Sequence, residues 1–230
     1  MKTRRNLAVI VASGTGTRMK TELPKQFMDL MGKPILSWTI SCFERCRLID
    51  EIVLVVPEDY LAYTSQSIVD KYDFKKINKI TTGGNTRQES VLAGLTACPR
   101  STDNVAIHDG VRPFVRDTLI ESLFESVTET KAVIPAVMAK ETVKFLDDNM
   151  LAKTLPRDRI YLAQTPQVFY YPAIFDFHQK AAEEEYEATD DAMLAEQYRM
   201  DVSIFEGHYD NIKITTPEDL ALAAEILKRW

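Results

Sequence analysis

Short apolar runs separated by stretches with helical spacing set the pattern of the first 135 residues. Several of the runs are apolar at almost every position, which is typical of strands buried on both faces of a parallel sheet. The runs are 7–12, 52–56, 79–82, 105–108 and 132–137. The stretches with helical spacing are 34–45, 58–72 and 87–97. Strands that alternate with helices predict an α/β fold with a doubly wound, mostly parallel sheet.

The alternation breaks after Val137. Two half-polar segments, 142–146 and 151–155, flank Asp147-Asp148-Asn149, which is a turn signal. They predict a β-hairpin arm, at about residues 138–160, that projects from the sheet. Because an isolated hairpin is marginal in water, we expect this arm to pack on another surface, such as a second subunit.

Alternating elements return after the arm. A helix is predicted at 171–185, and strands at 202–206 and 212–215. Thr216 followed by Pro217 predicts the start of the last helix, and Thr118 with Glu121 resembles a capping box that opens an earlier one. We expect the whole chain, residues 1–230, to form a single domain.

Composition argues against several classes of partner. The net charge of −6 argues against a broad basic surface for nucleic acid, although it is compatible with a local cationic pocket. No apolar run approaches the ~20 residues of a membrane span, and the first residues lack a signal-peptide pattern. The sequence therefore predicts a cytoplasmic protein with no membrane or nucleic-acid partner. Its three cysteines, Cys42, Cys46 and Cys98, are predicted to be buried free thiols.

Small residues follow the first predicted strand directly, at Ala12-Ser13-Gly14-Thr15-Gly16. They let the backbone approach a ligand and present N–H groups to phosphates. A dinucleotide fingerprint needs a third glycine where Met19 stands, which argues against an NAD-dependent dehydrogenase, and the Gly-Lys-Ser/Thr of a Walker A loop is absent. Arg18 and Lys25 add two cations that are suited to neutralising a triphosphate.

Two other strand ends carry candidate chemistry. Gly83 and Gly84 end a strand and lead into a helix through Asn85, and all three residue positions tolerate a positive φ. Asp109 ends another strand, at the edge where such sheets bind ligands, and its carboxylate can hold Mg²⁺ together with nucleotide phosphates. His108 beside it is expected to be a packed strand-end side chain, and we assign it no role.

Segments along nearly the whole chain resemble the sugar-phosphate cytidylyltransferases. Each segment alone is a modest signal, but all of them in the same order are highly specific. They are 12–19, Pro24-Lys25-Gln26-Phe27, 83–91, 108–113, 164–167, 189–191 and 210–215. The resemblance implies a Rossmann-like nucleotidyltransferase fold that transfers CMP from CTP to a small polyol phosphate. It also implies Mg²⁺ as cofactor and a homodimer.

The resemblance further implies roles for individual residues. Arg18 and Lys25 would stabilise the transition state, while Arg157 and Lys213 would position the acceptor phosphate. Asn85 (Asp in many members of the family) and Ser90 would lie beside the cytosine. The other implied nucleotide-binding residues are Ala12, Ser13, Gly14, Thr15, Gly16, Gly84, Arg87 and Asp109, and the implied acceptor-binding residues are Arg112, Thr142, Thr165 and Thr189.

The acceptor and the assembly follow from the same resemblance. Segment 87–95 and Asp210 favour methylerythritol phosphate as acceptor, with ribitol 5-phosphate as the alternative. A second alternative is a regulator that binds CTP without turnover. The presence of Arg18, Lys25, Arg157 and Lys213 together argues against it, since a pure binder needs no acceptor clamp. Because Arg157 follows the hairpin, the arm is expected to complete the partner's site in a homodimer.

Overall fold

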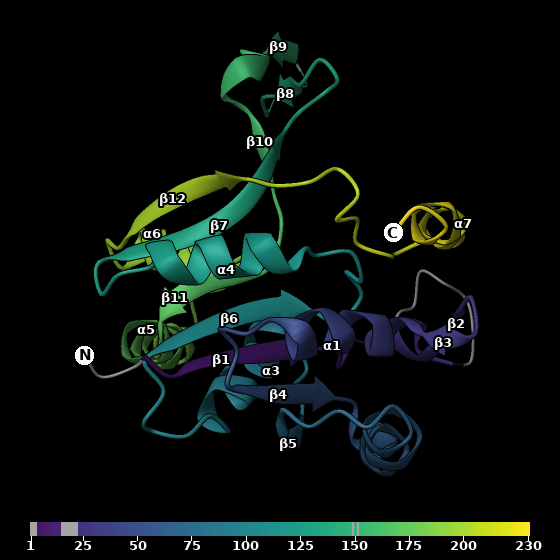
Figure 1. Cartoon of the computed structure of the whole chain (residues 1–230). Helices are drawn as coiled ribbons and strands as arrows, with labels where there is room; N and C mark the ends of the chain where they lie inside the picture. Colours follow the sequence, from purple (N-terminus) through teal and green to yellow (C-terminus); the bar gives the residue numbers. More distant parts are fainter. Residues whose placement is uncertain (1–3, 15–22, 149, 151) are drawn as a thin grey trace.

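The computed structural model describes residues 4–14, 23–148, 150 and 152–230. Within these residues the strands form an eight-stranded sheet in the order β10-β7-β11-β6-β1-β4-β5, with β12 paired to β7 (Figure 1). The bounds are β1 Asn6–Val11, β4 Glu51–Val56, β5 Ile77–Thr82, β6 Asn104–Asp109, β7 Lys131–Met138, β10 Tyr161–Ala163, β11 Gln167–Tyr170 and β12 Asp201–Glu206.

The first strand lies at the centre of the sheet, as its uninterrupted apolar sequence predicts. β1 pairs in parallel with both β4 and β6, so that Ile10 lies opposite Leu54 on one side and His108 on the other. β11 runs antiparallel to β6, and β10 antiparallel to β7, which makes the sheet mostly but not wholly parallel. The parallel strands bring the segments after β1, β5 and β6 to one edge of the sheet.

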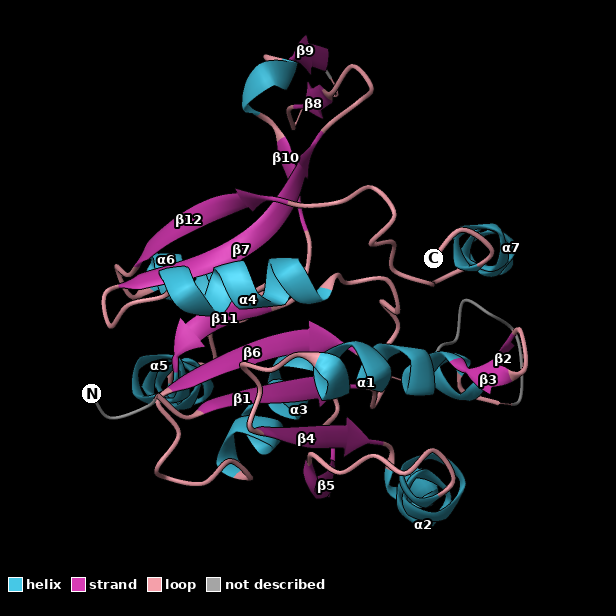
Figure 2. Ribbon diagram, viewed as in Figure 1, coloured by secondary structure: helices cyan, strands magenta, loops and turns pink. Residues whose placement is uncertain are grey.

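Helices cover both faces of the sheet, which confirms the doubly wound architecture (Figure 2). On one face lie α1 (Ile35–Arg45), α4 (Asp117–Ser126) and the segment around α2 (Leu61–Tyr63), and all of them contribute to one apolar cluster. The other face carries α3 (Arg87–Thr96), α5 (Tyr171–Glu183) and α6 (Asp191–Gln197). The last helix, α7 (Pro217–Leu227), packs beside the short strands β2 (Asp29–Leu30) and β3 (Lys33–Pro34) in a third, smaller cluster.

Two local predictions are wrong. Residues 212–215 form a loop, in which the Ile214 N–H donates to the Val111 carbonyl at 3.0 Å. Ile214 is buried against α7, so the apolar alternation reflects packing on a helix rather than a strand. The other error is the capping box at Thr118: α4 begins after Arg116, and no side chain caps it. The box at Thr216 is present, with α7 beginning at Pro217.

A pair of short strands stands apart from the main sheet. β8 (Lys144–Leu146) and β9 (Ala152–Thr154) pair antiparallel, with Phe145 opposite Lys153. They project beyond the sheet at the end of β7 and β10 (Figure 1). Phe145, in β8, and Met150, between the two strands, are 53% and 73% exposed, so the described part of the chain leaves apolar side chains of the arm uncovered.

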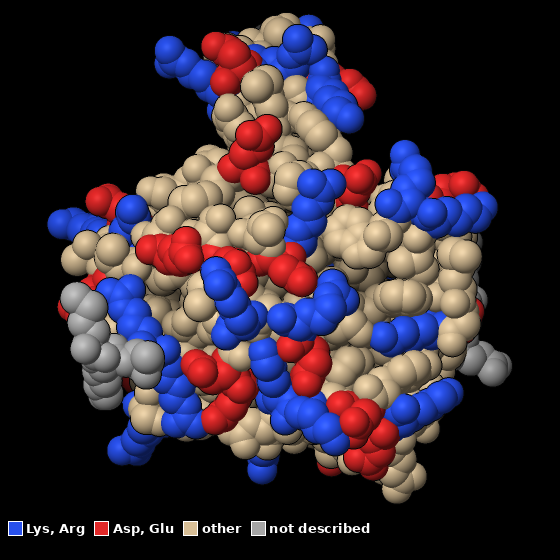
Figure 3. Space-filling model, viewed as in Figure 1, with Lys and Arg blue, Asp and Glu red and all other residues tan. Residues whose placement is uncertain are grey.

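The three cysteines are free and buried, as predicted. None of the described helices is long and apolar enough to cross a membrane. Basic and acidic side chains are interspersed over the face of the molecule shown in Figure 3.

Candidate active site

The segments that follow β1, β5 and β6 surround a cavity of about 500 Å³. Many of the residues singled out in the sequence meet here. Those that line it are Ala12, Ser13, Gly14, Lys25, Gly84, Asn85, Arg87, Ser90, Asp109 and Lys213. Val11, Gln26, Thr86 and Val111 complete the lining. Among the described residues, the cavity combines three cationic side chains with one carboxylate, that of Asp109, and with the N-terminus of α3, which favours anions.

A somewhat larger cavity, of about 590 Å³, lies between α3 and α5. It shares Thr86 and Arg87 with the first, but three glutamates, Glu89, Glu185 and Glu187, line the rest of it together with neutral polar and apolar side chains and His178. Three carboxylates would repel a phosphate-containing ligand. The smaller, cationic cavity is therefore the candidate active site.

Ser90 links the segment after β1 to the segment after β5 on one side of this cavity. Its buried hydroxyl lies 2.8 Å from the Ser13 hydroxyl, accepts from the Gly84 N–H at 3.1 Å and donates to the Thr86 carbonyl at 2.8 Å. A Cβ on Gly83 would lie 2.3 Å from the Ser13 Cβ, so only glycine permits this approach. The predicted reason for the glycines is wrong: neither they nor Asn85 has a positive φ, and close packing requires them instead.

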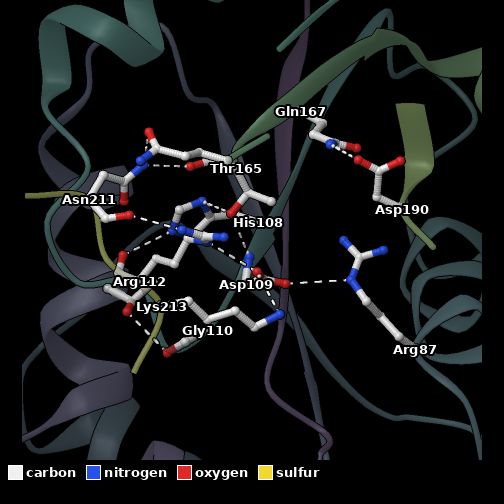
Figure 4. A network of polar contacts seen from close by, with 12 residues as sticks. Arg87, His108, Asp109, Gly110, Arg112, Thr165, Gln167, Asp190, Asn211 and Lys213 are labelled. Carbon is white, nitrogen blue, oxygen red and sulfur yellow. Dashed lines mark hydrogen bonds and ion pairs between the residues drawn. The ribbon is translucent and has the colours of Figure 1, made fainter. Parts of the chain in front are cut away.

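Asp109, the last residue of β6, is the centre of the charge network (Figure 4). Its Oδ2 lies 3.0 Å from the Lys213 Nζ and 3.2 Å from the Arg112 Nε, and its Oδ1 lies 3.5 Å from the Arg87 Nε. Burial alone raises the pKa of this carboxyl, but Lys213, Arg87 and Arg112 together hold the pKa well below its usual range. Asp109 is therefore ionised at neutral pH.

Lys213 reaches the cavity because its loop is fixed on both sides. Asn211 is fully buried, and its Nδ2 donates to the Thr165 carbonyl at 2.9 Å. Ile214 is tied to Val111 on the other side, as described above. Arg112 adds a third link, since its Nη1 donates to the Asn211 carbonyl at 2.9 Å (Figure 4).

His108 lies beneath the cavity and is not exposed in it. Its Nε2 faces the Arg112 carbonyl at 3.1 Å, and its Nδ1 faces the Thr165 hydroxyl at 2.9 Å. A carbonyl only accepts, so Nε2 carries the proton and Nδ1 accepts from Thr165. Burial lowers the pKa of His108 to about 4, and the ring is neutral at pH 7. The prediction of a packed histidine is confirmed. The Thr165 hydroxyl also accepts from the Asp109 N–H at 3.1 Å, so it helps to fix the backbone that carries the carboxylate.

Asp191, at the start of α6, anchors Arg87 from the other side. Its Oδ2 accepts from the Arg87 Nη2 at 2.7 Å, and its Oδ1 lies 3.1 Å from the His178 Nε2. Burial raises the pKa of Asp191, but Arg87 and His178 outweigh this and lower it to about 2. Its neighbour Asp190 caps α6 and accepts from Gln167 at 2.8 Å (Figure 4). Sequence reasoning assigned neither acid a role, although two acids before an apolar helix are a recognisable N-cap signal.

A magnesium ion fits this site only in company with phosphates. Among the described residues, no three His, Cys, Asp or Glu side chains are grouped closely enough to hold a metal ion. Mg²⁺ is commonly bound by one or two carboxylates together with substrate phosphates and water. Asp109 offers such a carboxylate at the cavity, and among the described residues its Oδ1 has the long, 3.5 Å contact with Arg87. Asp109 is therefore the residue that would hold the ion.

Several predicted residues lie elsewhere. Arg157 and Thr142 belong to the arm and are exposed, and the Arg157 Nη1 donates to the Lys140 carbonyl at 2.7 Å. Thr189 lines a different cavity, beside β7, β10 and β12. Arg112 is mostly buried behind Asp109. The remaining three predicted residues, Thr15, Gly16 and Arg18, lie outside the described residues.

A doubly wound sheet with a cationic, glycine-containing cavity at its carboxyl edge is the arrangement of a nucleotide-binding α/β protein. The sequence model of one such family, 2-C-methyl-D-erythritol 4-phosphate cytidylyltransferase, matches residues 7–229. The chain belongs to this family.

Individual relatives agree with the family match. The 2-C-methyl-D-erythritol 4-phosphate cytidylyltransferase of Clostridium kluyveri is 46% identical over 97% of this chain and 96% of its own length. That of Clostridium novyi is 42% identical over 97% of each chain. A crystal structure of 4-diphosphocytidyl-2C-methyl-D-erythritol synthase from Anaerococcus prevotii superposes with a TM-score of 0.88 at 36% identity, covering 99% of this chain and 97% of its own.

Proposed function

We propose that this protein transfers the CMP group of CTP to 2-C-methyl-D-erythritol 4-phosphate, giving 4-CDP-2-C-methyl-D-erythritol and pyrophosphate. The observation that carries the proposal is the cavity in which the family's motif residues meet: Lys25 lines it together with Asp109 and Lys213, which form an ion pair. Family membership favours methylerythritol phosphate over ribitol 5-phosphate as acceptor.

The reaction needs little acid–base chemistry. The second pKa of a phosphate monoester is about 6, so the acceptor is largely a dianion at pH 7 and its oxygen is already a nucleophile. That oxygen forms a bond to the α-phosphorus of CTP, while the bond from this phosphorus to the bridging oxygen of pyrophosphate breaks. No proton has to be removed, which is consistent with the neutral, buried state of His108.

Bringing two anions together is the main obstacle, so positioning and charge stabilisation dominate. Lys25 is suited to the phosphates of CTP and Lys213 to the acceptor phosphate, because both line the cavity. Arg18 would act with Lys25. Mg²⁺ held by Asp109 and the CTP phosphates supplies further charge neutralisation when bound. Asp109 in turn holds Lys213 in place through the 3.0 Å ion pair.

Pyrophosphate release tests the proposal directly. With CTP and Mg²⁺, release is expected with methylerythritol phosphate and far less with ribitol 5-phosphate. Equal or reversed rates would contradict the acceptor, and equal rates with ATP or GTP would contradict cytosine selection. Binding of CTP without release of pyrophosphate would favour the alternative function, a regulator that binds CTP without turnover.

A pair of lysine variants tests the charge stabilisation. Lys25→Ala should lower kcat by roughly 10²–10³-fold, as for other preorganised charge stabilisers. Lys180→Ala is the matched control, since its exposed i,i+4 pair with Asp176 lies on α5, outside the cavity. Equal loss in both variants, or full activity of a folded Lys25→Ala protein, would exclude the role of Lys25.

We infer in addition that the protein acts as a homodimer in which each arm completes the partner's site. Arg157 and Thr142, which the family resemblance assigns to the acceptor phosphate, do not line the cavity of their own chain. The exposed apolar side chains of the arm, β10 and β12 suit a partner's surface. They include Phe145, Leu146, Met150, Tyr161, Leu162 and Ile204.

Complementation between two inactive variants tests this arrangement. Arg157→Ala and Lys25→Ala proteins should each be nearly inactive. In a mixed dimer one site carries both defects and the other carries neither. After subunit exchange, activity should recover to about a quarter of wild type if half the dimers are mixed and the two sites are independent. Proven exchange without recovery would mean that Arg157 serves its own chain.

A further inference from the structure

Gln26 is a buried polar residue that lines the cavity. The proposed reaction assigns it no role. It lies between Lys25 and Phe27 in a short 3₁₀ turn, Lys25–Phe27, and its side chain is 1% exposed. Its Nε2 donates to the Ala12 carbonyl at 2.6 Å and to the Gly14 carbonyl at 3.1 Å. Both carbonyls belong to the segment that leaves β1 and enters the glycine-containing loop.

These two hydrogen bonds use both donors of the carboxamide group. A carbonyl oxygen carries partial negative charge, and one that turned toward a triphosphate would repel it. Because Gln26 binds both oxygens, the backbone from Ala12 to Gly14 is held in one orientation. These three residues then need no rearrangement when an anion enters the cavity, which is the condition for preorganised binding.

The same contacts fix Lys25 relative to the loop. The 3₁₀ turn is anchored on its other side by Phe27, whose ring stacks on Tyr60 at 4.7 Å and meets Tyr63 edge-on at 5.3 Å. Gln26 is thus a direct polar link between the segment that carries Lys25 and the segment that carries Ser13 and Gly14, and both segments line the cavity.

We propose that Gln26 is a positioning residue for the triphosphate: it holds the start of the glycine-containing loop and Lys25 in a single geometry, and so sets the affinity for CTP. The proposal rests on the function proposed above. Substitution of Gln26 should weaken CTP binding. It should leave the KM for the acceptor phosphate nearly unchanged, since Lys213 is anchored independently through Asn211 and Ile214.

Two variants separate positioning from stability. Gln26→Glu keeps the shape but replaces both donors with acceptors, so the carboxylate faces two carbonyl oxygens. Gln26→Met keeps the length and removes all polarity. Thr102→Val is the control, because it removes a buried hydrogen bond (2.6 Å to the Pro99 carbonyl) before β6, at the end of that strand opposite Asp109.

The decisive measurement is the equilibrium binding of CTP by calorimetry. The melting temperature of each variant is measured alongside it, to show that the variant is folded. The Kd for CTP should rise at least tenfold in Gln26→Glu and several-fold in Gln26→Met, while Thr102→Val binds CTP as wild type does. Unchanged affinity in either folded Gln26 variant, or an equal rise in Thr102→Val, would overturn the proposal. Wild-type protein that binds CTP but releases no pyrophosphate would refute the proposed reaction alone, because binding still tests Gln26.

Discussion

Asp191→Asn offers a quantitative test of the buried charge network. Asp191 is 1% exposed and holds Arg87 at 2.7 Å and His178 at 3.1 Å. Asparagine has nearly the same shape but no charge. Its oxygen can accept from one of the two partners, while its NH₂ group then faces a donor on the other. The substitution therefore removes one of the two contacts and takes the charge out of the other. Where the Arg87 contact is the one lost, the guanidinium, which is 28% exposed, keeps its longer contact to Asp109.

The pKa gives the magnitude. Arg87 and His178 lower the pKa of Asp191 from 3.8 to about 2, against the opposing effect of burial. At 1.36 kcal/mol per pKa unit, the ionised carboxylate contributes about 2 kcal/mol to the free energy of unfolding at neutral pH. For a chain of this size, 1 kcal/mol corresponds to roughly 2–4 °C in Tm, so Asp191→Asn should lower Tm by about 4–8 °C.

The dependence on pH distinguishes this explanation from general damage. A depressed pKa stabilises the fold above the unfolded-state pKa, and this contribution is lost as pH falls through the folded-state value. The gap in unfolding free energy between wild type and Asp191→Asn should therefore be constant above pH 5 and narrow between about pH 4 and pH 2, to roughly half near pH 3. Urea unfolding at several pH values measures it.

The control is Asp176→Asn, which removes an exposed carboxylate paired with Lys180 and should change stability by no more than about 0.5 kcal/mol. The reasoning is refuted if Asp191→Asn is as stable as wild type at pH 6, or if the gap persists undiminished at pH 3.

Three further predictions concern the framework. Thr216→Ala removes the capping box of α7 and should cost about 1 kcal/mol by urea unfolding, with Thr216→Ser recovering most of it. Gly94→Ala should destabilise by roughly 1–3 kcal/mol despite better helix propensity, because the new Cβ would lie 2.4 Å from the Val9 Cγ1; an unchanged unfolding midpoint would contradict this packing. Burial raises the pKa of Cys42 to about 11 and of Cys98 to about 12, so both thiols should react slowly with Ellman's reagent at pH 8 until the protein is denatured.

The parts of the fold that could be predicted are those in which local sequence and burial agree. β1 and β4 are apolar at nearly every position because both of their faces are covered by helices, and this requirement is visible in the sequence itself. The site residues at the strand ends followed from the same logic, since parallel strands bring Ser13 and Asp109 to one edge.

The parts that could not be predicted depend on partners distant in sequence. β10 and β11 are three and four residues long and take their pairing from β7 and β6, so their own sequences carry little signal. Residues 212–215 show an alternation that a strand and a loop packed on a helix share. Position 83 requires glycine because Ser13, a residue 70 positions away, packs against it, and not because the backbone turns there.

The charge balance of the site is also a property of the fold and not of any motif. Arg87, Arg112 and Lys213 converge on Asp109, and close approach of three cations would be unfavourable without carboxylates among them. Asp109 and Asp191 supply two negative charges, so this part of the network keeps one excess positive charge, to which Lys25 adds another at the cavity wall. A nucleoside triphosphate carries several negative charges, which this excess of positive charge would attract. In the proposed reaction the two acids would hold the cations together before the nucleotide arrives, so that binding need not first overcome the mutual repulsion of the cations.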